Sequence, residues 1–517
     1  MCLSVNQQRY CLLYPTQKKR SITPTPSLLP DYNVGQRAGP PKIETVDVDT
    51  RKQVEDAKMK NLVWLLPRMS NLENQTISSW TGFNIQIRDD VNVIQDTVNY
   101  LPTINAPATE MSTVNEALSQ TLNIMKSLHL KKIVCVFDQA LYAKAAEIVW
   151  KQDQFQNIII RMGTFHTVCN LLSTIGKRFQ DAGLRDLCVE SGVIAEGSVT
   201  GVMEGRKYNR AVRLHKLVYE AMVRMAWKGF LPWLQAKHVE EVCNLEETLK
   251  SVEAFQDGVS HAQVEEVLQS ASCTRILKLF ENYLDSLRDG CGLSAFWASY
   301  LDMGEILLAL LRASREGDWM HHLAAIRQMI PWCFAYDKLN YARFLPYYYA
   351  TMSRLPIDHP DVHEHFMQGG FSVQIGEKNP FGRIHVDQTI EETINKDTQT
   401  SRGTKGFSLK CGAVARYYMT SEYRSMYLRQ LRDMIGHQNS DISHPDLQPP
   451  RIKRDEADVQ SLVDLMETSW LNSFSPNHPE LVSLSTATVA PPAIAEDLLG
   501  AHKIGEEAYK AFRQERL

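Results

Sequence analysis

The sequence lacks the short motifs by which several large enzyme classes are recognised. No GxxxxGK[ST], no GxGxxG after a strand, no HExxH and no GxSxG occurs in its 517 residues. P-loop NTPases, Rossmann dehydrogenases, protein kinases, zincins and serine hydrolases therefore have no support. The ten cysteines include no C-x-x-C pair, which excludes a zinc ribbon and a thioredoxin motif.

Long apolar runs and a strong net charge are also missing. The run Cys11–Tyr14 is too short for the core of a signal peptide, and the apolar helical pattern at Met303–Leu311 is shorter than a membrane span. We therefore expect an intracellular protein, in the nucleus or cytoplasm, without membrane contact. The formal net charge of −4 predicts that any nucleic-acid site is a local basic patch.

The composition is otherwise that of an ordinary globular protein, with 44% hydrophobic and 22% charged residues. A chain of 517 residues is too long for one compact core, which predicts more than one domain. Six prolines lie among Thr, Ser and Gly in the first 50 residues, as is typical of a disordered leader. The expected division is a leader over 1–50, the first part of an α/β core over 51–180, a helical insertion over 181–368, the second part of the core over 369–436, and a linker with C-terminal helices over 437–517.

Two short apolar runs that alternate with helical patterns predict a parallel pair of strands. The run 131–138 is bounded by charge and precedes a helical pattern over 139–151, and the run 157–162 precedes a second helical pattern over 164–179. Buried strands joined by helices are typical of a parallel pair that is covered on both faces. The alternation from Trp80 to Ile87 predicts a further strand.

The remaining strand patterns are few. Thr97–Ile104 is expected to be an edge strand because it contains Pro102. Between about 180 and 370 only helical patterns follow one another. A strand is expected again over 369–375, followed by a helix over 386–396. The predicted fold class is therefore α/β, with a sheet interrupted by a large all-helical insertion.

Several short runs resemble one family of eukaryotic proteins derived from mobile elements. Its members occur as expanded, repetitive open reading frames and carry a domain of unknown function. The runs are Trp80–Asn84, Asn105–Thr113, Phe137–Tyr142, Arg161–His166, Tyr208–Ala211 and Val386–Glu391. The resemblance covers roughly Trp80 to Gly436; it is specific for membership and implies no particular activity.

A second, weaker resemblance concerns the order of acidic residues. DDE transposases of the hAT type place an Asp at the end of a strand, then a helix, a strand followed by His, a large helical insertion and a helix that bears Glu. The corresponding features here are Asp138, the strand at 157–162, His166, the helical block and the helix with Asp387, Glu391 and Glu392. The resemblance implies a ribonuclease-H-like mixed sheet with an all-helical insertion.

The chain departs from the transposase pattern in two ways. A working site of that type needs a carboxylate on the first strand, whereas Asp89, Asp90 and Asp96 only flank or follow the predicted strand at 83–87. No zinc finger precedes the core either. These departures indicate a truncated or immobilised descendant.

Asp138, Asp387 and Glu391 are the predicted metal ligands. Asp138 ends a strand, where ligands of α/β sheets gather, and Asp387 and Glu391 share one helical face. Such carboxylates suit Mg²⁺ or Mn²⁺, which would stabilise the reacting phosphodiester. The alternatives are that Asp138 caps the following helix and that the other two are solvent-facing charges.

Asp138, His166 and Glu391 are the predicted catalytic residues. His166 lies just beyond a predicted strand, at a helix start, and could act on a leaving group or orient a carboxylate. The alternative for His166 is a structural hydrogen bond.

The stretch 204–228 is the predicted nucleic-acid patch, because seven basic side chains face two acidic ones there, a net charge of +5. Arginines on one helical face could contact phosphates, and Tyr208 could stack on a base. The predicted residues are Arg206, Lys207, Tyr208, Arg210 and Arg213. The alternative is a charged helix surface paired with the acidic stretch 240–253.

Taken together, these patterns predict a transposon-derived protein that acts on DNA. It would be a relic of a metal-dependent polynucleotidyl transferase or nuclease with Mg²⁺ or Mn²⁺ as cofactor, and it could form a homo-oligomer. The alternative is a non-catalytic scaffold that binds nucleic acid or protein and retains the fold.

Overall fold

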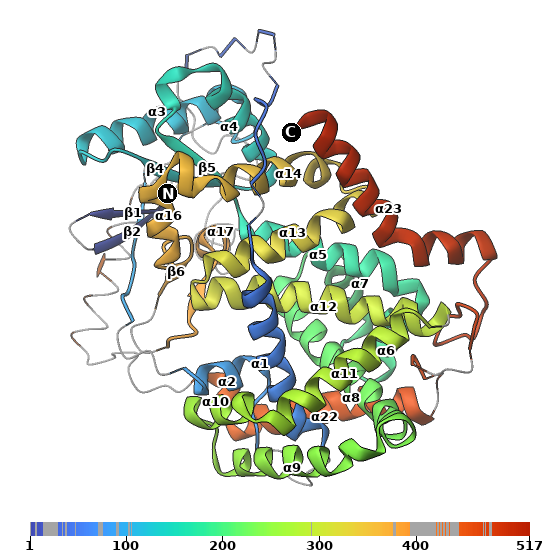
Figure 1. Cartoon of the computed structure of the whole chain (residues 1–517). Helices are drawn as coiled ribbons and strands as arrows, with labels where there is room; N and C mark the ends of the chain where they lie inside the picture. Colours follow the sequence, from blue (N-terminus) through green and yellow to red (C-terminus); the bar gives the residue numbers. More distant parts are fainter. Residues whose placement is uncertain are drawn as a thin grey trace.

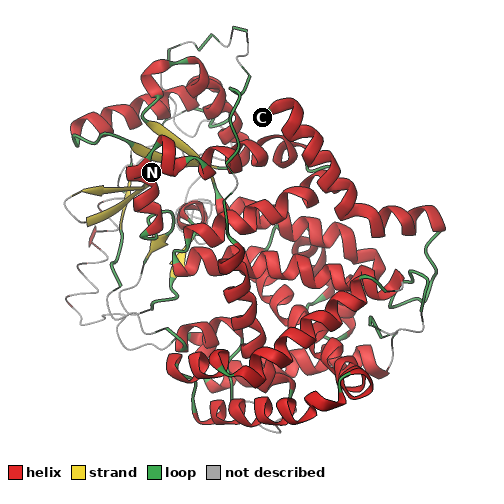
Figure 2. Ribbon diagram, in the orientation of Figure 1, coloured by secondary structure: helices red, strands yellow, loops and turns green. Residues whose placement is uncertain are grey.

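The structure is a computed structural model. It describes residues 2–5, 8–13, most of 29–50, 51–70, 76–88, 93–101, 106–290, 292–375, 379–392, 444–468 and 478–517, with single residues between these ranges. Helix accounts for 71% of the structure and strand for 5%, and Figure 2 shows how far the helices dominate. The predicted α/β class, with a ribonuclease-H-like mixed sheet and a helical insertion, is therefore wrong. The strands of two to six residues are too short to bury most of the apolar surface, which packs between helices instead.

The described helices follow one another along most of the chain. The first group is α1 Arg51–Met69, α2 Trp80–Gln86, α3 Met111–Ser127, α4 Gln139–Lys151, α5 Thr164–Phe179, α6 Leu184–Glu190, α7 Glu196–Met203, α8 Tyr208–Lys237, α9 Val242–Glu253 and α10 His261–Gln269. The second group is α11 Ala271–Arg288, α12 Gly292–Glu316, α13 Trp319–Ala335, α14 Leu339–Ser353, α15 Leu355–Asp358, α16 Pro360–Met367, α17 Val386–Glu391, α22 Pro449–Thr468 and α23 Pro492–Arg516.

The larger sheet lies at one side of the helical body (Figure 1). Its strand order is β3-β2-β1-β4-β5. The strands are β1 Cys2–Val5, β2 Gln8–Leu13, β3 Thr97–Tyr100, β4 Ile133–Phe137 and β5 Ile158–Met162. Only β2 with β3 and β4 with β5 run parallel, while β1 is antiparallel to both of its neighbours. The expected edge strand at Thr97 is confirmed, because β3 forms one edge.

The parallel pair predicted from the two apolar runs is confirmed. Val134 lies opposite Ile159, and Phe137 lies opposite Met162. The helices α4 and α5 begin directly after the two strands, as expected. A small core between α3, α4 and the two strands includes Leu118 and Ile148, both fully buried. This packing fixes the carboxyl ends of β4 and β5 side by side.

The predicted strand at Trp80–Ile87 is instead the helix α2. Trp80, Phe83 and Ile87 are all buried, and their three- and four-residue spacing places them on one helical face. Asn84 donates a side-chain hydrogen bond to the carbonyl of Trp80 at 2.7 Å. The alternation of polar and apolar residues wrongly indicated a strand because residues 80–84 are all buried. The polarity of these side chains therefore does not reveal the helical period.

The strands that follow the helical block are short. Two antiparallel pieces, β6 Val373–Gln374 and β7 Arg383–Ile384, form a separate two-stranded sheet. The helix predicted over 386–396 begins as expected, as α17. The glycine-rich loop and long helix that the sequence also predicts, between 397 and 434, lie almost entirely outside the described residues.

The middle of the helical body is formed by α5, α8, α12 and α13, with α22 against α8 and α23 against α13 (Figure 1). Among the described helices, α12 is the one long and apolar enough to cross a membrane. However, 72% of its apolar window is buried inside the protein, as in a core helix. The predicted domain division stays a prediction.

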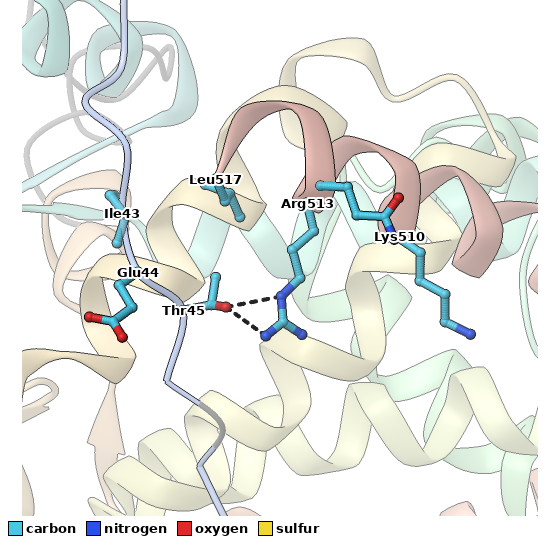
Figure 3. A pocket seen from close by; sticks show the side chains of 7 residues that line it. Ile43, Glu44, Thr45, Lys510, Arg513 and Leu517 are labelled. Atoms are coloured by element: carbon cyan, nitrogen blue, oxygen red, sulfur yellow. Dashed lines mark hydrogen bonds between the residues drawn. The ribbon is translucent and has the colours of Figure 1, made fainter.

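A surface recess of about 510 Å³ lies between residues 43–45 and the end of α23. Figure 3 shows Arg513 donating to the hydroxyl of Thr45, at 3.0 Å from Nε. Glu44 also forms an ion pair with Arg354 at 3.5 Å. The lining of this recess contains none of the predicted site residues, so the site is found elsewhere.

Candidate functional site

Three predicted carboxylates act on the imidazole of the predicted residue His166. His166 lies in the first turn of α5, Asp138 directly follows β4, and Asp387 and Glu391 lie on α17. Nδ1 of His166 is 3.0 Å from Oδ2 of Asp387, and Nε2 is 3.9 Å from Oε1 of Glu391. The negative charge of Asp138 also acts on the imidazole. We call these four residues the carboxylate–histidine cluster.

Asp387 holds the N-terminus of α5. Its carboxylate is 8% exposed and accepts the backbone N–H groups of Phe165 at 3.0 Å and His166 at 3.1 Å. The N-cap position of α5 is Gly163, which has no side chain to cap the helix. A carboxylate more than 200 residues further along the chain therefore takes this part, and it joins α17 to the end of β5.

Gly163 makes this approach possible. A methyl group in place of its hydrogen would collide with Oδ2 of Asp387. Its backbone N–H donates to the carbonyl of Phe137 at 2.7 Å, so the end of β4 is tied to the same point. The backbone angles at Gly163 are ordinary, so they do not require glycine. Glycine is required here because of the close contact with Asp387.

The electrostatics of the cluster favour an ion pair. Burial disfavours the imidazolium of His166, but the hydrogen bond to Asp387 and the charges of Asp387, Asp138 and Glu391 outweigh it and raise the pKa of His166. Burial likewise opposes the charge of Asp387, but its hydrogen bonds to His166 and to the backbone lower the pKa of this carboxyl. Near neutral pH the imidazole is therefore protonated more often than an ordinary histidine.

Asp138 caps α4. Its Oδ1 accepts the backbone N–H of Leu141 at 2.8 Å, so the helix-cap alternative describes a real contact. The second oxygen makes no hydrogen bond to any described residue. The same half-buried carboxylate also adds to the field at His166, so capping does not exclude a role in chemistry.

The three predicted metal ligands are not a ready-made ion site. Asp387 already receives two backbone N–H groups and the imidazole. No group of three or more His, Cys, Asp or Glu side chains within the described ranges is arranged to hold a metal ion. Asp138 and Glu391 are the two carboxylates of the cluster that do not cap α5. Binding of Mg²⁺ or Mn²⁺ stays a prediction.

Three neighbouring residues were not predicted from the sequence. His385 bonds Ser314 at 2.8 Å and the hydroxyl of Tyr208 at 3.2 Å. Burial first, and then the charges of Asp387 and other groups, raise the pKa of Tyr341 well above its ordinary range. Of these three residues, Gly163 gave the clearest signal in the sequence, because it lies between a predicted strand and a predicted helix. Tyr341 was hidden in an aromatic run typical of packing.

The predicted nucleic-acid face is divided in the structure. Arg213 pairs with Asp455 and Asp458 of α22, and the ring of Tyr208 packs on Phe165 with centroids 4.6 Å apart. Neither is free to contact a strand. Three exposed basic residues remain, and they are Arg206, paired with Glu204, Lys207, and Arg210, bonded to Ser198.

The partners of this helix are also different from those expected. The alternative interpretation paired it with the acidic stretch 240–253. Instead Arg213, Arg224 and Lys228 pair with carboxylates of α22. These partners follow more than 230 residues later, so sequence proximity could not identify them.

The fold and the cluster define a mostly helical protein with a titratable carboxylate–histidine group at the ends of two parallel strands. Over residues 79–517 the chain matches the family described as "Domain of unknown function (DUF8702)", and it belongs to that family. The match includes every residue of the cluster. No curated protein and no solved structure matches the chain. The family match does not itself indicate a mobile-element or hAT origin.

Proposed function

We propose that the carboxylate–histidine cluster is the active site of an enzyme that cleaves or transfers phosphodiester bonds of DNA. The observation that carries the proposal is the contact of one imidazole with two carboxylates, Asp387 at 3.0 Å and Glu391 at 3.9 Å, while the charge of Asp138 acts on the same ring. These residues come from segments more than 200 residues apart. Perturbed acids and bases that gather at the ends of strands are typical of catalytic centres.

His166 is the general acid–base group in this proposal. Asp387 binds Nδ1 and is a positioning residue, so Nε2 is the nitrogen that can exchange a proton with substrate. When water attacks phosphorus, a P–O bond forms to the water oxygen, which releases a proton to solvent, while the P–O3′ bond breaks and the imidazolium donates its proton to the leaving oxygen. The neutral imidazole then takes a proton from solvent. The raised pKa of His166 favours the proton-donating form.

The two remaining carboxylates contribute through a bound metal ion in this proposal. Asp138 and Glu391 would hold Mg²⁺ or Mn²⁺, which would offset the charge that develops on the phosphate. The mobile-element origin, a place in the nucleus or cytoplasm, DNA as partner and a homo-oligomer remain part of the proposal. The origin is supported by the resemblance of the six short runs quoted from the sequence.

A non-catalytic scaffold is the second candidate, and the hydrogen bonds of the cluster favour it. Asp138 and Asp387 each fasten the start of a helix, as structural carboxylates do. In this view the cluster only joins α4, α5 and α17. The two candidates differ in whether loss of the imidazole affects chemistry or only stability.

The test is nicking of supercoiled plasmid by the full-length protein in Mn²⁺, in Mg²⁺ and in EDTA. His166→Gln and Glu391→Gln should each lower the rate at least about 100-fold, the size of a general acid–base contribution. Glu392→Gln is the matched control, because this neighbouring carboxylate bonds Asn209 at 2.7 Å and should change the rate less than about twofold. Absence of nicking by the wild type in every metal would reject the enzyme and favour the scaffold.

A further inference from the structure

Two cationic side chains lie over adjoining aromatic rings near Tyr208. Nζ of Lys216, on α8, is 5.8 Å from the centre of the Trp80 ring. The guanidinium carbon of Arg315, on α12, is 5.4 Å from the centre of the Phe381 ring. The two rings meet edge to face with centroids 5.5 Å apart. We call Lys216 and Arg315 the basic pair.

The charges of the basic pair are poorly satisfied. Lys216 donates to the hydroxyl of Thr81 at 2.7 Å. Arg315 makes no hydrogen bond or ion pair with any described residue, although its guanidinium carries five donors. It differs in this from Arg178, which is also packed among aromatic rings and donates to Ser299, Tyr336 and the carbonyl of Leu498.

The surroundings of the basic pair carry an excess of positive charge. Asp446 acts on both members of the pair, but it is already 3.4 Å from Arg451. Three cations therefore share this carboxylate. Asp455, the next acid, is bonded to Arg213 and Arg451. This excess of positive charge favours a bound anion.

Half-buried cations without enough partners disfavour each other. Burial lowers the pKa of Lys216 to about 8, and the nearby charge of Arg315 contributes in the same direction. Burial also lowers the pKa of Arg315. A bound anion would offset both effects, because it supplies the opposite charge and hydrogen-bond acceptors.

Arg315 is connected to the carboxylate–histidine cluster through Tyr208. The charge of Arg315 acts on the phenol of Tyr208. The same phenol bonds His385, and its ring packs on Phe165, which contacts His166 with centroids 5.1 Å apart. Packed rings therefore connect Arg315 with this cluster.

We infer that Lys216 and Arg315 form a binding site for a phosphate group of a nucleic-acid strand. A guanidinium fork and an ammonium group recognise phosphate oxygens together. The site does not use the exposed residues Arg206, Lys207 and Arg210. It requires neither a metal ion nor catalysis at His166, so it can be tested independently of the proposed enzyme activity.

The test is fluorescence anisotropy of a labelled single-stranded oligonucleotide, at low salt and in EDTA, with the full-length protein. Lys216→Met and Arg315→Gln should each raise Kd at least about tenfold, because each removes a charged hydrogen bond to phosphate. Lys228→Met is the matched control, since it removes the same charge from the same helix but breaks an exposed pair with Glu467. It should leave Kd within about twofold.

A second readout guards against variants that merely unfold. Wild-type binding should weaken as the pH rises through about 8, because Lys216, which faces Arg315, Arg451, Asp446 and Asp455, loses its charge there. Lys216→Arg should abolish this pH dependence and still bind. Loss of the pH dependence in the arginine variant cannot be explained by unfolding.

The competitor distinguishes the source of the phosphate. Inorganic pyrophosphate that displaces the oligonucleotide at low millimolar concentration would assign a small phosphate ligand to the basic pair. Failure of pyrophosphate, together with weaker strand binding by both charge-removing variants, would assign a strand phosphate. The inference is overturned if the wild type binds neither probe, or if Lys228→Met weakens binding as much as the other two variants.

Discussion

The helical body and the end of the β4–β5 pair both bury a carboxylate, but they stabilise it in different ways. In the body, Glu220 is 1% exposed and accepts from Arg68 and Arg224, each at 2.6 Å. At the strand ends, Asp387 accepts from backbone N–H groups and from His166. One partner set consists of two arginines, while the other contains a histidine, whose pKa is raised.

This difference separates structural charge from titratable charge within one molecule. Arg68 and Arg224 also share Glu456, so the network joins α1, α8 and α22. The ion pairs of such a network can only stay intact or be disrupted. The cluster around His166 contains a group that can gain and lose a proton, which is what acid–base chemistry requires.

The largest effect is expected where the body loses its buried charge. Glu220→Gln leaves two arginines facing a neutral amide, and breaking such a buried pair costs about 3–5 kcal/mol. The midpoint of urea unfolding should fall accordingly. Glu467→Gln, which breaks the exposed pair with Lys228, should change stability by less than about 1 kcal/mol. Equal effects would show that burial does not distinguish these charges.

The next effect is expected at the contact between the strand end and α17. Gly163→Ala places a methyl group against Oδ2 of Asp387, so the carboxylate must move, at a cost of about 1–3 kcal/mol. The same shift weakens the bond to His166. We expect a lower melting temperature and a lower pKa of His166. Gly197→Ala is the control, because no atom lies within 4 Å of the added carbon there. A full-strength His166–Asp387 bond in Gly163→Ala would contradict the stated reason for glycine.

A smaller effect should appear as a pH dependence. His166 has a pKa raised above its ordinary 6.5, so its stabilisation is complete below that value and is lost as the pH rises through the folded-state pKa. Asp387 has a pKa lowered below its ordinary 3.8, so its contribution is lost only as the pH falls through that lower value. The pair therefore stabilises fully between about pH 4 and 6.5.

Asp387→Asn should remove this dependence. Unfolding midpoints measured between pH 5 and 8.5 should fall with rising pH more steeply in the wild type than in the variant. Other buried histidines, such as His215 and His321, have a lowered pKa and contribute with the opposite sign, but they are common to both proteins. Parallel curves would mean that His166 and Asp387 do not form an ion pair.

Local patterns were enough to predict the part of the fold that carries the cluster. Both parallel strands and the helices that follow them were expected within one or two residues of their observed ends. The expected grouping of Asp138, His166 and the carboxylates of α17 also rests on these elements. Strand ends are visible in a sequence because burial, charge and helix starts all change there.

The fold class and the charge partners could not be predicted in this way. The overall class depends on how helices from distant segments pack, and the alternation at 80–87 concealed a helix that is buried all round. The fate of Arg213 was set by Asp455 and Asp458 on a helix more than 200 residues away. A basic patch in a sequence shows which cationic side chains are present. Only the folded structure shows which of them pair with acidic side chains and which remain available for a ligand.

The smallest change in stability is expected for a pair of helix caps, and it bears most directly on chemistry. Asp138 caps α4 and Asp318 caps α13 through similar hydrogen bonds, at 2.8 and 2.9 Å. Asparagine caps helices about as well as aspartate, so Asp138→Asn and Asp318→Asn should each change stability by less than about 0.5 kcal/mol. Urea midpoints at pH 7 check this expectation.

The two variants should differ at His166. The pKa of this imidazole depends on the charges of Asp387, Asp138 and Glu391, so Asp138→Asn should lower it and Asp318→Asn should not. Ring proton shifts in histidine-labelled protein, assigned with His166→Gln, measure that pKa directly. If both variants leave it unchanged, Asp138 is a helix cap like Asp318, and the strand end resembles the body after all. If only Asp138→Asn lowers it, the same carboxylate fastens a helix and tunes an acid, and capping ceases to count against catalysis.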